Sequence, residues 1–182
     1  GRVQGNLLLR KRQYELASKE DAQVAIAASC LLGKIANSRK VIERAVRDHA
    51  MLVDVPVLQA ASASLKETLV SVENCTSVES LRGLEGNAAK RYFEVFGQLV
   101  LHQHEDFAFT EPLDPMNALL SFLYTLLTNQ VTSALETVGV DPYVGFLHTD
   151  RPGRPSLALD MMEELRPVFA DRLALTLINR KQ

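Results

Sequence analysis

Apolar residues return every three or four positions along most of the 182-residue chain. Leu31, Ile35 and Ile42 belong to one such series, which runs from about residue 20 to residue 49 and is interrupted by Gly33. This spacing places apolar side chains on one face of an α-helix, where they pack into a core. The pattern predicts an all-α, multi-helix fold. The predicted helices cover approximately residues 20–49, 56–73, 80–101, 115–138 and 156–165, and a last helix begins at Pro167.

Polar residues and glycine mark where these helices begin and end. Thr76-Ser77-Val78-Glu79 has the form of a capping box, in which a hydroxyl and a carboxylate accept hydrogen bonds from the first free amides. Asp114-Pro115 predicts the start of the next helix, and Gly139 predicts its end. Ser156 is expected to cap the helix that follows. The polar, proline-containing segment 102–113 is expected to form a loop.

The first residues differ from the rest of the chain. Residues 1–10 carry a strand-like pattern, and the sequence starts at Gly1 without a methionine, so we expect that an N-terminal part of the protein is missing. The remaining length is sufficient for one domain with a hydrophobic core. No window approaches the ~18 consecutive apolar residues of a transmembrane helix, so we expect no association with a membrane.

The charge of the chain limits the kinds of partner. A net charge of −2 and a pI near 6.1 argue against a purely electrostatic nucleic-acid binder. Basic residues are nevertheless clustered around Arg39, at Lys90-Arg91, and at Arg151 with Arg154. Each cluster by itself also fits a solvated surface. Together the clusters are compatible with a local basic track.

A histidine and two acids in the C-terminal third suggest a metal site. His148 ends an apolar segment, and Asp160 and Glu163 follow one turn apart on the next predicted helix. Carboxylate oxygens suit Mg²⁺ or Mn²⁺, and one imidazole favours Mn²⁺. Taken singly, His148 also fits a hydrogen-bonded core histidine, and the two acids also fit an ordinary helix face.

A further acid, Glu85, stands beside Gly86 in a helical segment with Ala88 and Ala89 on the same face. These small residues leave room for another helix or a ligand, although an exposed helix charge is an equally simple interpretation. Other chemistries have less support, because the chain contains no G-x-S-x-G elbow, no P-loop and no paired Cys/His zinc spacing.

Five motifs, taken together and in order, resemble a known family. They are Gly33-Lys34-Ile35-Ala36-Asn37-Ser38-Arg39, Leu84-Glu85-Gly86-Asn87-Ala88-Ala89, Asp114-Pro115-Met116-Asn117-Ala118-Leu119-Leu120, Gly145-Phe146-Leu147-His148 and Ser156-Leu157-Ala158-Leu159-Asp160-Met161-Met162-Glu163. The chain resembles, over nearly its whole length, the CRISPR-associated endonuclease/integrase of the adaptation complex (Cas protein one). The Arg151–Pro155 loop is most similar to the type I-C branch.

The resemblance implies a domain organisation and a set of site residues. Residues 15–182 would form the helical catalytic domain, and residues 1–14 would be a linker or the end of the family's β-rich N-terminal domain. The implied ligands of Mg²⁺ or Mn²⁺ are Glu85, His148 and Glu163, which we expect to converge in one cleft, with Asp160 as an auxiliary ligand.

The resemblance also implies an activity and partners. A 3′-hydroxyl of a short DNA fragment would attack a phosphodiester of the CRISPR repeat, and the fragment would be joined by transesterification. The full-length protein would be a cytoplasmic prokaryotic homodimer that assembles with a dimer of the Cas protein two. Asn117 is expected to have a structural role near the site. The expected phosphate contacts are Arg39, Lys90, Arg91, Arg151 and Arg154.

Two other functions remain open from the sequence. The same ligands would serve a stand-alone metal-dependent nuclease that cuts branched or single-stranded nucleic acid with water as the nucleophile. Alternatively, Glu85, His148 and Glu163 would be unrelated groups of a non-catalytic helical interaction module. The distances between these three side chains separate the last function from the first two.

Overall fold

The computed structural model describes residues 6–101 and 115–180. Within these ranges the chain is helical and contains no β-strand, which confirms the all-α prediction. The predicted loop at 102–113 lies outside the described residues. The elements are α1 (Leu7–Ala17), α2 (Glu20–Asp48), α3 (Val55–Glu73), α4 (Val78–Phe96), the 3₁₀ turn η1 (Gly97–Leu99), α5 (Pro115–Val138), α6 (Ser156–Met162), the π-helical turn η3 (Arg166–Asp171) and α7 (Arg172–Asn179).

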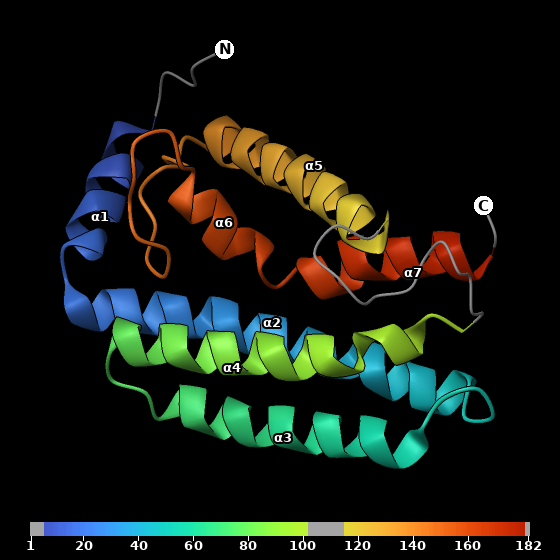
Figure 1. The fold of residues 1–182 in the computed structure, drawn as a ribbon. Helices are drawn as coiled ribbons and strands as arrows, with labels where there is room; N and C mark the ends of the chain where they lie inside the picture. Colours follow the sequence, from blue (N-terminus) through green and yellow to red (C-terminus); the bar gives the residue numbers. More distant parts are fainter. Residues whose placement is uncertain (1–5, 102–114, 181–182) are drawn as a thin grey trace.

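The helices form two layers (Figure 1). Helices α2, α3 and α4 pack against one another in one layer. The second layer contains α5, α6, η3 and α7, and it contacts the first layer mainly through η3 and α6 on α2. Helix α2 is therefore the element shared by both layers, and side chains on its inner face meet residues from distant parts of the chain.

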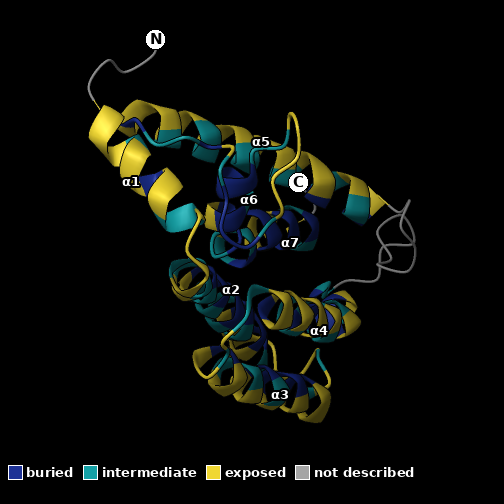
Figure 2. Cartoon of the chain, turned by 90° about the vertical axis from the view of Figure 1, so that its left-hand side faces the viewer, coloured by how far each residue is buried: buried dark blue, intermediate teal, exposed yellow. Residues whose placement is uncertain are grey.

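The core lies along this shared helix. Leu31, Ile35 and Ile42, which belong to the periodic series, are at most 1% exposed. Figure 2 shows that α6 is buried between the surrounding helices. A helix as short as α6 is not stable by itself, and burial of its apolar side chains against neighbouring helices stabilises it. Among the described helices, none combines the length and the apolar character needed to cross a bilayer.

The helix boundaries follow the predicted signals with local shifts. Asp54, which was not predicted as a cap, accepts a hydrogen bond from Val57 N at the start of α3, and, as predicted, Gly139 ends α5 in the left-handed conformation (φ 83°). The capping-box prediction is displaced by one residue, because Ser77 rather than Thr76 accepts the bond from Ser80 N. The capping prediction for Ser156 is wrong: this residue is already helical, and its hydroxyl donates to the carbonyl of Thr149.

Two predicted helices have different ends in the structure. The helix expected to reach residue 101 ends at Phe96 and continues as η1. The helix expected over 156–165 ends at Met162, and the π-helical turn η3 leads into α7. The wider π turn begins one residue before Pro167, which has no N–H to donate to the regular ladder.

The strand-like pattern at the start of the chain does not form a strand where it is described. Residues 7–10 lie in α1, so the strand prediction is wrong for them, and residues 1–5 lie outside the described part. The buried side chain of Gln13 bonds to the backbone of Asp141 and Val144. Helix α1 thereby holds the connection between α5 and α6. The assignment of residues 1–14 to a linker or a further domain stays a prediction.

Candidate active site

Asp160 anchors the loop that carries His148. Its fully buried carboxylate accepts hydrogen bonds from the backbone N–H groups of Phe146 (2.6 Å), Leu147 (2.9 Å) and His148 (2.9 Å). The same carboxylate lies 2.7 Å from Nδ1 of the His148 ring. A carboxylate partner places the ring proton on Nδ1 and leaves the lone pair on Nε2. Asp160 therefore fixes both the position and the tautomer of His148.

These contacts do not fit the prediction that Asp160 is an auxiliary metal ligand. A carboxylate offers about four acceptor positions, and four N–H donors occupy those of Asp160. Its role in this geometry is to orient His148, in the way that carboxylates orient metal-binding or catalytic imidazoles.

A close approach of the backbone makes this arrangement possible. A Cβ atom at Gly145 would lie 2.7 Å from Cβ of Ser156 and 3.0 Å from Oδ2 of Asp160. The loop can reach α6 only because this position has no side chain. On the other side, Arg82 of α4 donates to the carbonyl of Leu147 at 2.7 Å. Helices α4 and α6 together hold the loop before His148.

The other two predicted ligands meet at a lysine. Nζ of Lys34, on the inner face of α2, lies 2.6 Å from Oε1 of Glu85 and 2.5 Å from Oε2 of Glu163. The Lys34 side chain is 11% exposed, that of Glu85 is 23% exposed, and that of Glu163 is 1% exposed. Glu85 comes from α4 and Glu163 follows α6, so three elements contribute to one small charged cluster.

Glu163 is the most buried member of this cluster. Its Oε1 lies 3.1 Å from NH1 of Arg166, so each of its oxygens faces a cation. Neither oxygen forms a hydrogen bond of normal geometry with a described residue. The Arg166 guanidinium also lies 4.8 Å from the centre of the Tyr124 ring, a cation–π distance. Glu163 is thus a buried carboxylate that contacts two cationic side chains, Lys34 and Arg166, as ion pairs.

The electrostatics of the cluster favour ionised Glu85. Burial by itself would raise the pKa of Glu85, but the charge of Lys34 and its hydrogen bond outweigh burial and hold the pKa below its ordinary value. The charge of Arg166 acts in the same direction.

A buried tyrosine pair and an acid form the floor of an adjoining cavity of about 130 Å³, which Lys34 and Glu85 also line. Asp171 accepts hydrogen bonds from the hydroxyls of Tyr92 (3.0 Å) and Tyr124 (2.6 Å). Burial raises the pKa of Asp171 to about 6, although the tyrosine bonds and the charge of Arg166 oppose the shift. Burial, with the charge of Asp171, also raises the pKa values of both tyrosines.

The predicted convergence is present in part. Across the described ranges, no three His, Cys, Asp or Glu side chains are grouped closely enough to hold a metal ion as they stand. Glu85 and Glu163 do meet, around Lys34, while His148 is held separately by Asp160. Two carboxylates that already share one cationic group, together with the imidazole held by Asp160, are a donor set whose chemistry fits a divalent cation.

The predicted DNA contacts have different environments. Arg39 of α2 donates a hydrogen bond to the carbonyl of Ser62 on α3. It also donates to the carboxylate of Glu43 on its own helix. Lys90 and Arg151 are exposed, and Arg154 is partly buried. The partly exposed Arg91 pairs with Glu94.

Asn117 lies in the first turn of α5 and is partly buried. Its predicted structural role near the site stays a prediction.

Sequence reasoning missed Lys34, Arg166 and the cluster around Asp171. One signal was available for Lys34, because it lies between Leu31, Ile35 and Ser38 on the buried face of α2. A lysine in an apolar stripe requires an anionic partner. No local signal indicated which acids would be those partners, since Glu85 and Glu163 are distant in sequence.

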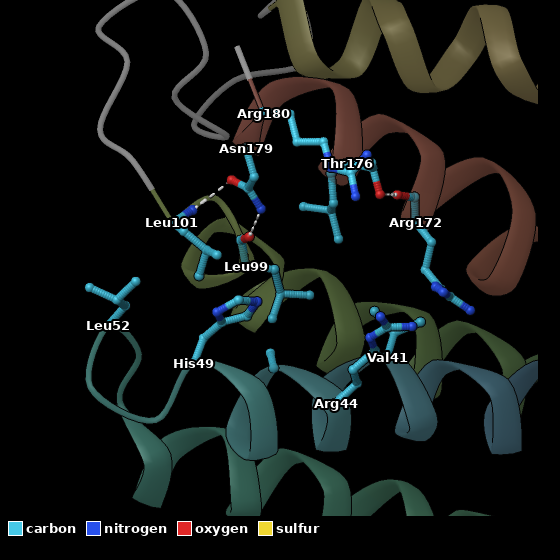
Figure 3. A pocket seen from close by; sticks show the side chains of 12 residues that line it. Val41, Arg44, His49, Leu52, Leu99, Leu101, Arg172, Thr176, Asn179 and Arg180 are labelled. Carbon is cyan, nitrogen blue, oxygen red and sulfur yellow. Dashed lines mark hydrogen bonds between the residues drawn. The ribbon is translucent and has the colours of Figure 1, made fainter. Parts of the chain in front are cut away.

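A larger cavity of about 440 Å³ lies elsewhere, between α2, η1 and α7 (Figure 3). Figure 3 shows Arg44, Arg172 and Arg180 around it, and Asn179 joins the carbonyl of Leu99 to the amide of Leu101 across one side. No acidic residue is among the described residues that line this cavity. It therefore offers no carboxylate to a metal ion, and the small charged cluster remains the candidate active site.

Comparison with known proteins identifies the family of the chain. Residues 1–182 match the family model described as CRISPR associated protein Cas1. The chain belongs to the Cas1 family. CRISPR-associated endonuclease Cas1 2 of Rhodospirillum rubrum is 53% identical over 196 positions, which cover 100% of this chain and 55% of that protein.

Two solved structures share the fold of this Cas1 domain. A casposase bound to integration product is 26% identical, with a TM-score of 0.77, and the match covers 97% of this chain and 51% of that chain. A partial Cas6-RT-Cas1–Cas2 complex is 29% identical, with a TM-score of 0.77, over 92% of this chain and 49% of that chain. The chain thus spans about half of each protein. The type I-C assignment stays a prediction.

Proposed function

We propose that this Cas1 domain is the metal-dependent catalytic unit of a DNA integrase and endonuclease that joins short DNA fragments into a CRISPR array. The observation that carries the proposal is the pair Glu85 and Glu163, which share the ammonium group of Lys34, together with an imidazole that a buried carboxylate holds in place. The similarity to a named CRISPR-associated endonuclease and to a casposase bound to integration product supports it.

Glu85, Glu163 and the Nε2 atom of His148 are the groups that would hold one Mg²⁺ or Mn²⁺ ion. Two oxygens bonded to one ammonium at 2.6 and 2.5 Å are already close. When bound, such an ion stabilises negative charge on a phosphodiester and helps to deprotonate an attacking hydroxyl.

The protein groups supply positioning and charge. Asp160 keeps His148 in one tautomer, so that Nε2 serves as a ligand or accepts a proton. Arg166, held between Glu163 and Tyr124, adds positive charge where a phosphate would enter. In the transesterification, the new phosphorus–oxygen bond replaces the one that breaks, and the proton of the attacking 3′-hydroxyl passes to the departing 3′-oxygen. No protein nucleophile is therefore required.

DNA in the form of a prespacer and a CRISPR repeat, a second Cas1 subunit and a dimer of Cas2 are the proposed partners. The two similar solved structures, one bound to integration product and one a Cas1–Cas2 complex, support the first and the last of these. The exposed Lys90 and Arg151, together with Arg154 and Arg91, are proposed to contact phosphates. Such contacts position DNA without reading its sequence.

The deciding experiment is a strand-joining assay with a labelled 3′-hydroxyl DNA fragment, a CRISPR repeat duplex, the Cas2 partner and Mn²⁺. Glu85→Gln and His148→Asn are expected to abolish joining while circular dichroism remains helical. Lys66→Met, on the exposed face of α3, is the matched control and is expected to retain activity. Cutting without joining would favour the stand-alone nuclease. Neither reaction in the unmodified protein would favour the interaction module.

A further inference from the structure

We infer that Lys34 is an internal competitor of the divalent ion: its ammonium group holds Glu85 and Glu163 together in the metal-free protein, and it must leave them when the ion enters. This inference rests on the proposed function, since it concerns the same two carboxylates. It assigns Lys34 as a positioning residue that sets the metal affinity of the site.

The first support is the position of the ammonium group. Nζ of Lys34 is in contact with one oxygen of Glu85 and one oxygen of Glu163, at 2.6 and 2.5 Å. A cation that binds the two carboxylates jointly would compete with this ammonium group for the same negative charges. The side chain of Lys34 is largely buried, so its charge is only weakly screened by water and its contacts are not those of a freely moving surface lysine.

The second support is the balance of charge in the cluster. Two carboxylates, Glu85 and Glu163, face two cations, Lys34 and Arg166. A divalent ion added to this balanced set would leave a large excess of positive charge in a poorly hydrated region, which is unfavourable. Arg166 is restrained by the ring of Tyr124, whereas no ring contact restrains Lys34. Lys34, rather than Arg166, is therefore the cation that moves away when the divalent ion binds.

The third support is that the lysine has a place to go. The cavity of about 130 Å³ is lined by Lys34, Glu85 and Asp171. A lysine side chain has four rotatable carbon–carbon bonds and a compact charge, so it can relocate without movement of the helix.

Without Lys34, the two acids would repel each other until a metal ion joined them. In Lys34→Met we therefore expect two changes relative to the unmodified protein. The midpoint of thermal unfolding in EDTA falls, and the Kd for Mn²⁺ decreases at least about tenfold, because the ion no longer displaces a charged hydrogen-bonded partner. Lys66→Met, which removes an exposed ammonium from α3, should change neither quantity.

Isothermal titration of the chain with Mn²⁺ tests the inference. Tighter binding in Lys34→Met, unchanged binding in Lys66→Met and loss of binding in Glu85→Gln would support it. Equal or weaker affinity in Lys34→Met, with binding still lost in Glu85→Gln, would overturn the inference and leave the metal site of the proposed function intact. No binding of Mn²⁺ by any of these proteins would remove both.

A second measurement needs no variant and therefore covers the case in which Lys34→Met does not fold. Acetylation of each lysine is followed by mass spectrometry in EDTA and in saturating Mg²⁺. Release from the two acids should raise the acetylation rate of Lys34 several-fold, while the rate at Lys66 stays constant. An acetylation rate of Lys34 that is the same in saturating Mg²⁺ as in EDTA would contradict the displacement of this side chain.

Discussion

The carboxylate of Asp160 contacts His148 twice: Oδ1 lies 2.7 Å from the ring nitrogen Nδ1 and 2.9 Å from the backbone nitrogen. Asp160 follows His148 by twelve positions, and the segment between them includes the Arg151–Pro155 loop, so a buried carboxylate joins the two ends of this segment. Through Asp160, the start of α6 determines where the imidazole lies and which of its nitrogens is available. The stability of this region and the orientation of His148 are therefore coupled.

Asp160→Asn should lower the free energy of unfolding by about 2–4 kcal/mol, since an amide accepts fewer of the four N–H donors and its NH₂ group opposes some of them. His148→Asn should cost less, because the backbone bonds to Asp160 remain. Urea denaturation followed by circular dichroism gives both values. Equal costs for the two variants would show that the backbone bonds contribute little.

Gly145→Ala should disturb the same region by a steric route. The added methyl group would approach Ser156 and Asp160 to 3.0 Å or less, so the loop must move away from α6. Gly83→Ala is the matched control, because nothing lies within 4 Å of its Cβ position on α4. It should stabilise the protein by up to about 1 kcal/mol through helix propensity. In thermal unfolding, the midpoint should fall for Gly145→Ala and rise for Gly83→Ala.

Asp171 should make stability dependent on pH. Its pKa in the folded protein is raised from 3.8 to about 6, so its favourable contribution is complete below about pH 4 and is lost as the pH rises through 6. The loss is on the order of 3 kcal/mol. Asp171→Asn removes this dependence, so the variant should gain stability relative to the unmodified protein between pH 4.5 and 7.5.

Urea denaturation at several pH values measures that difference. Asp21→Asn, at an exposed carboxylate in the first turn of α2, serves as the control and should show a nearly constant difference from the unmodified protein. A constant difference for Asp171→Asn as well would mean that the burial of this carboxyl does not govern its ionisation.

The two cysteines should differ in reactivity. Burial, with the charges of Asp160, Glu164 and Glu163, raises the pKa of Cys30 to about 12, whereas Cys75 is only partly buried. Since the thiolate is the reactive form, the variant Cys75→Ser should react with a disulfide reagent at pH 8 only after urea is added. The variant Cys30→Ser should react without urea. Rapid reaction of native Cys75→Ser would contradict the burial of Cys30.

Local pattern was sufficient to predict most helices of this chain. The spacing of Leu31, Ile35 and Ile42 requires a helix with one buried face, and Gly139 supplies the conformation that ends α5. Boundaries were less certain, because neighbouring hydroxyls such as Thr76 and Ser77 compete for the same free amides. Residues 7–10 also show the limit of local pattern, since the helix there is supported by bonds from Gln13 to residues about 130 positions away.

The sequence by itself indicated Glu85, His148, Asp160 and Glu163 as candidate ligands, and the resemblance of its motifs to a known family joined them into one set. Only the tertiary structure showed that these residues have different contacts. Asp160 turns to the backbone before His148, while Glu163, one helical turn later, meets Lys34 of α2. Periodicity determines which face of a helix is buried, but the partner of that face depends on how distant helices pack, and residue spacing does not encode that packing.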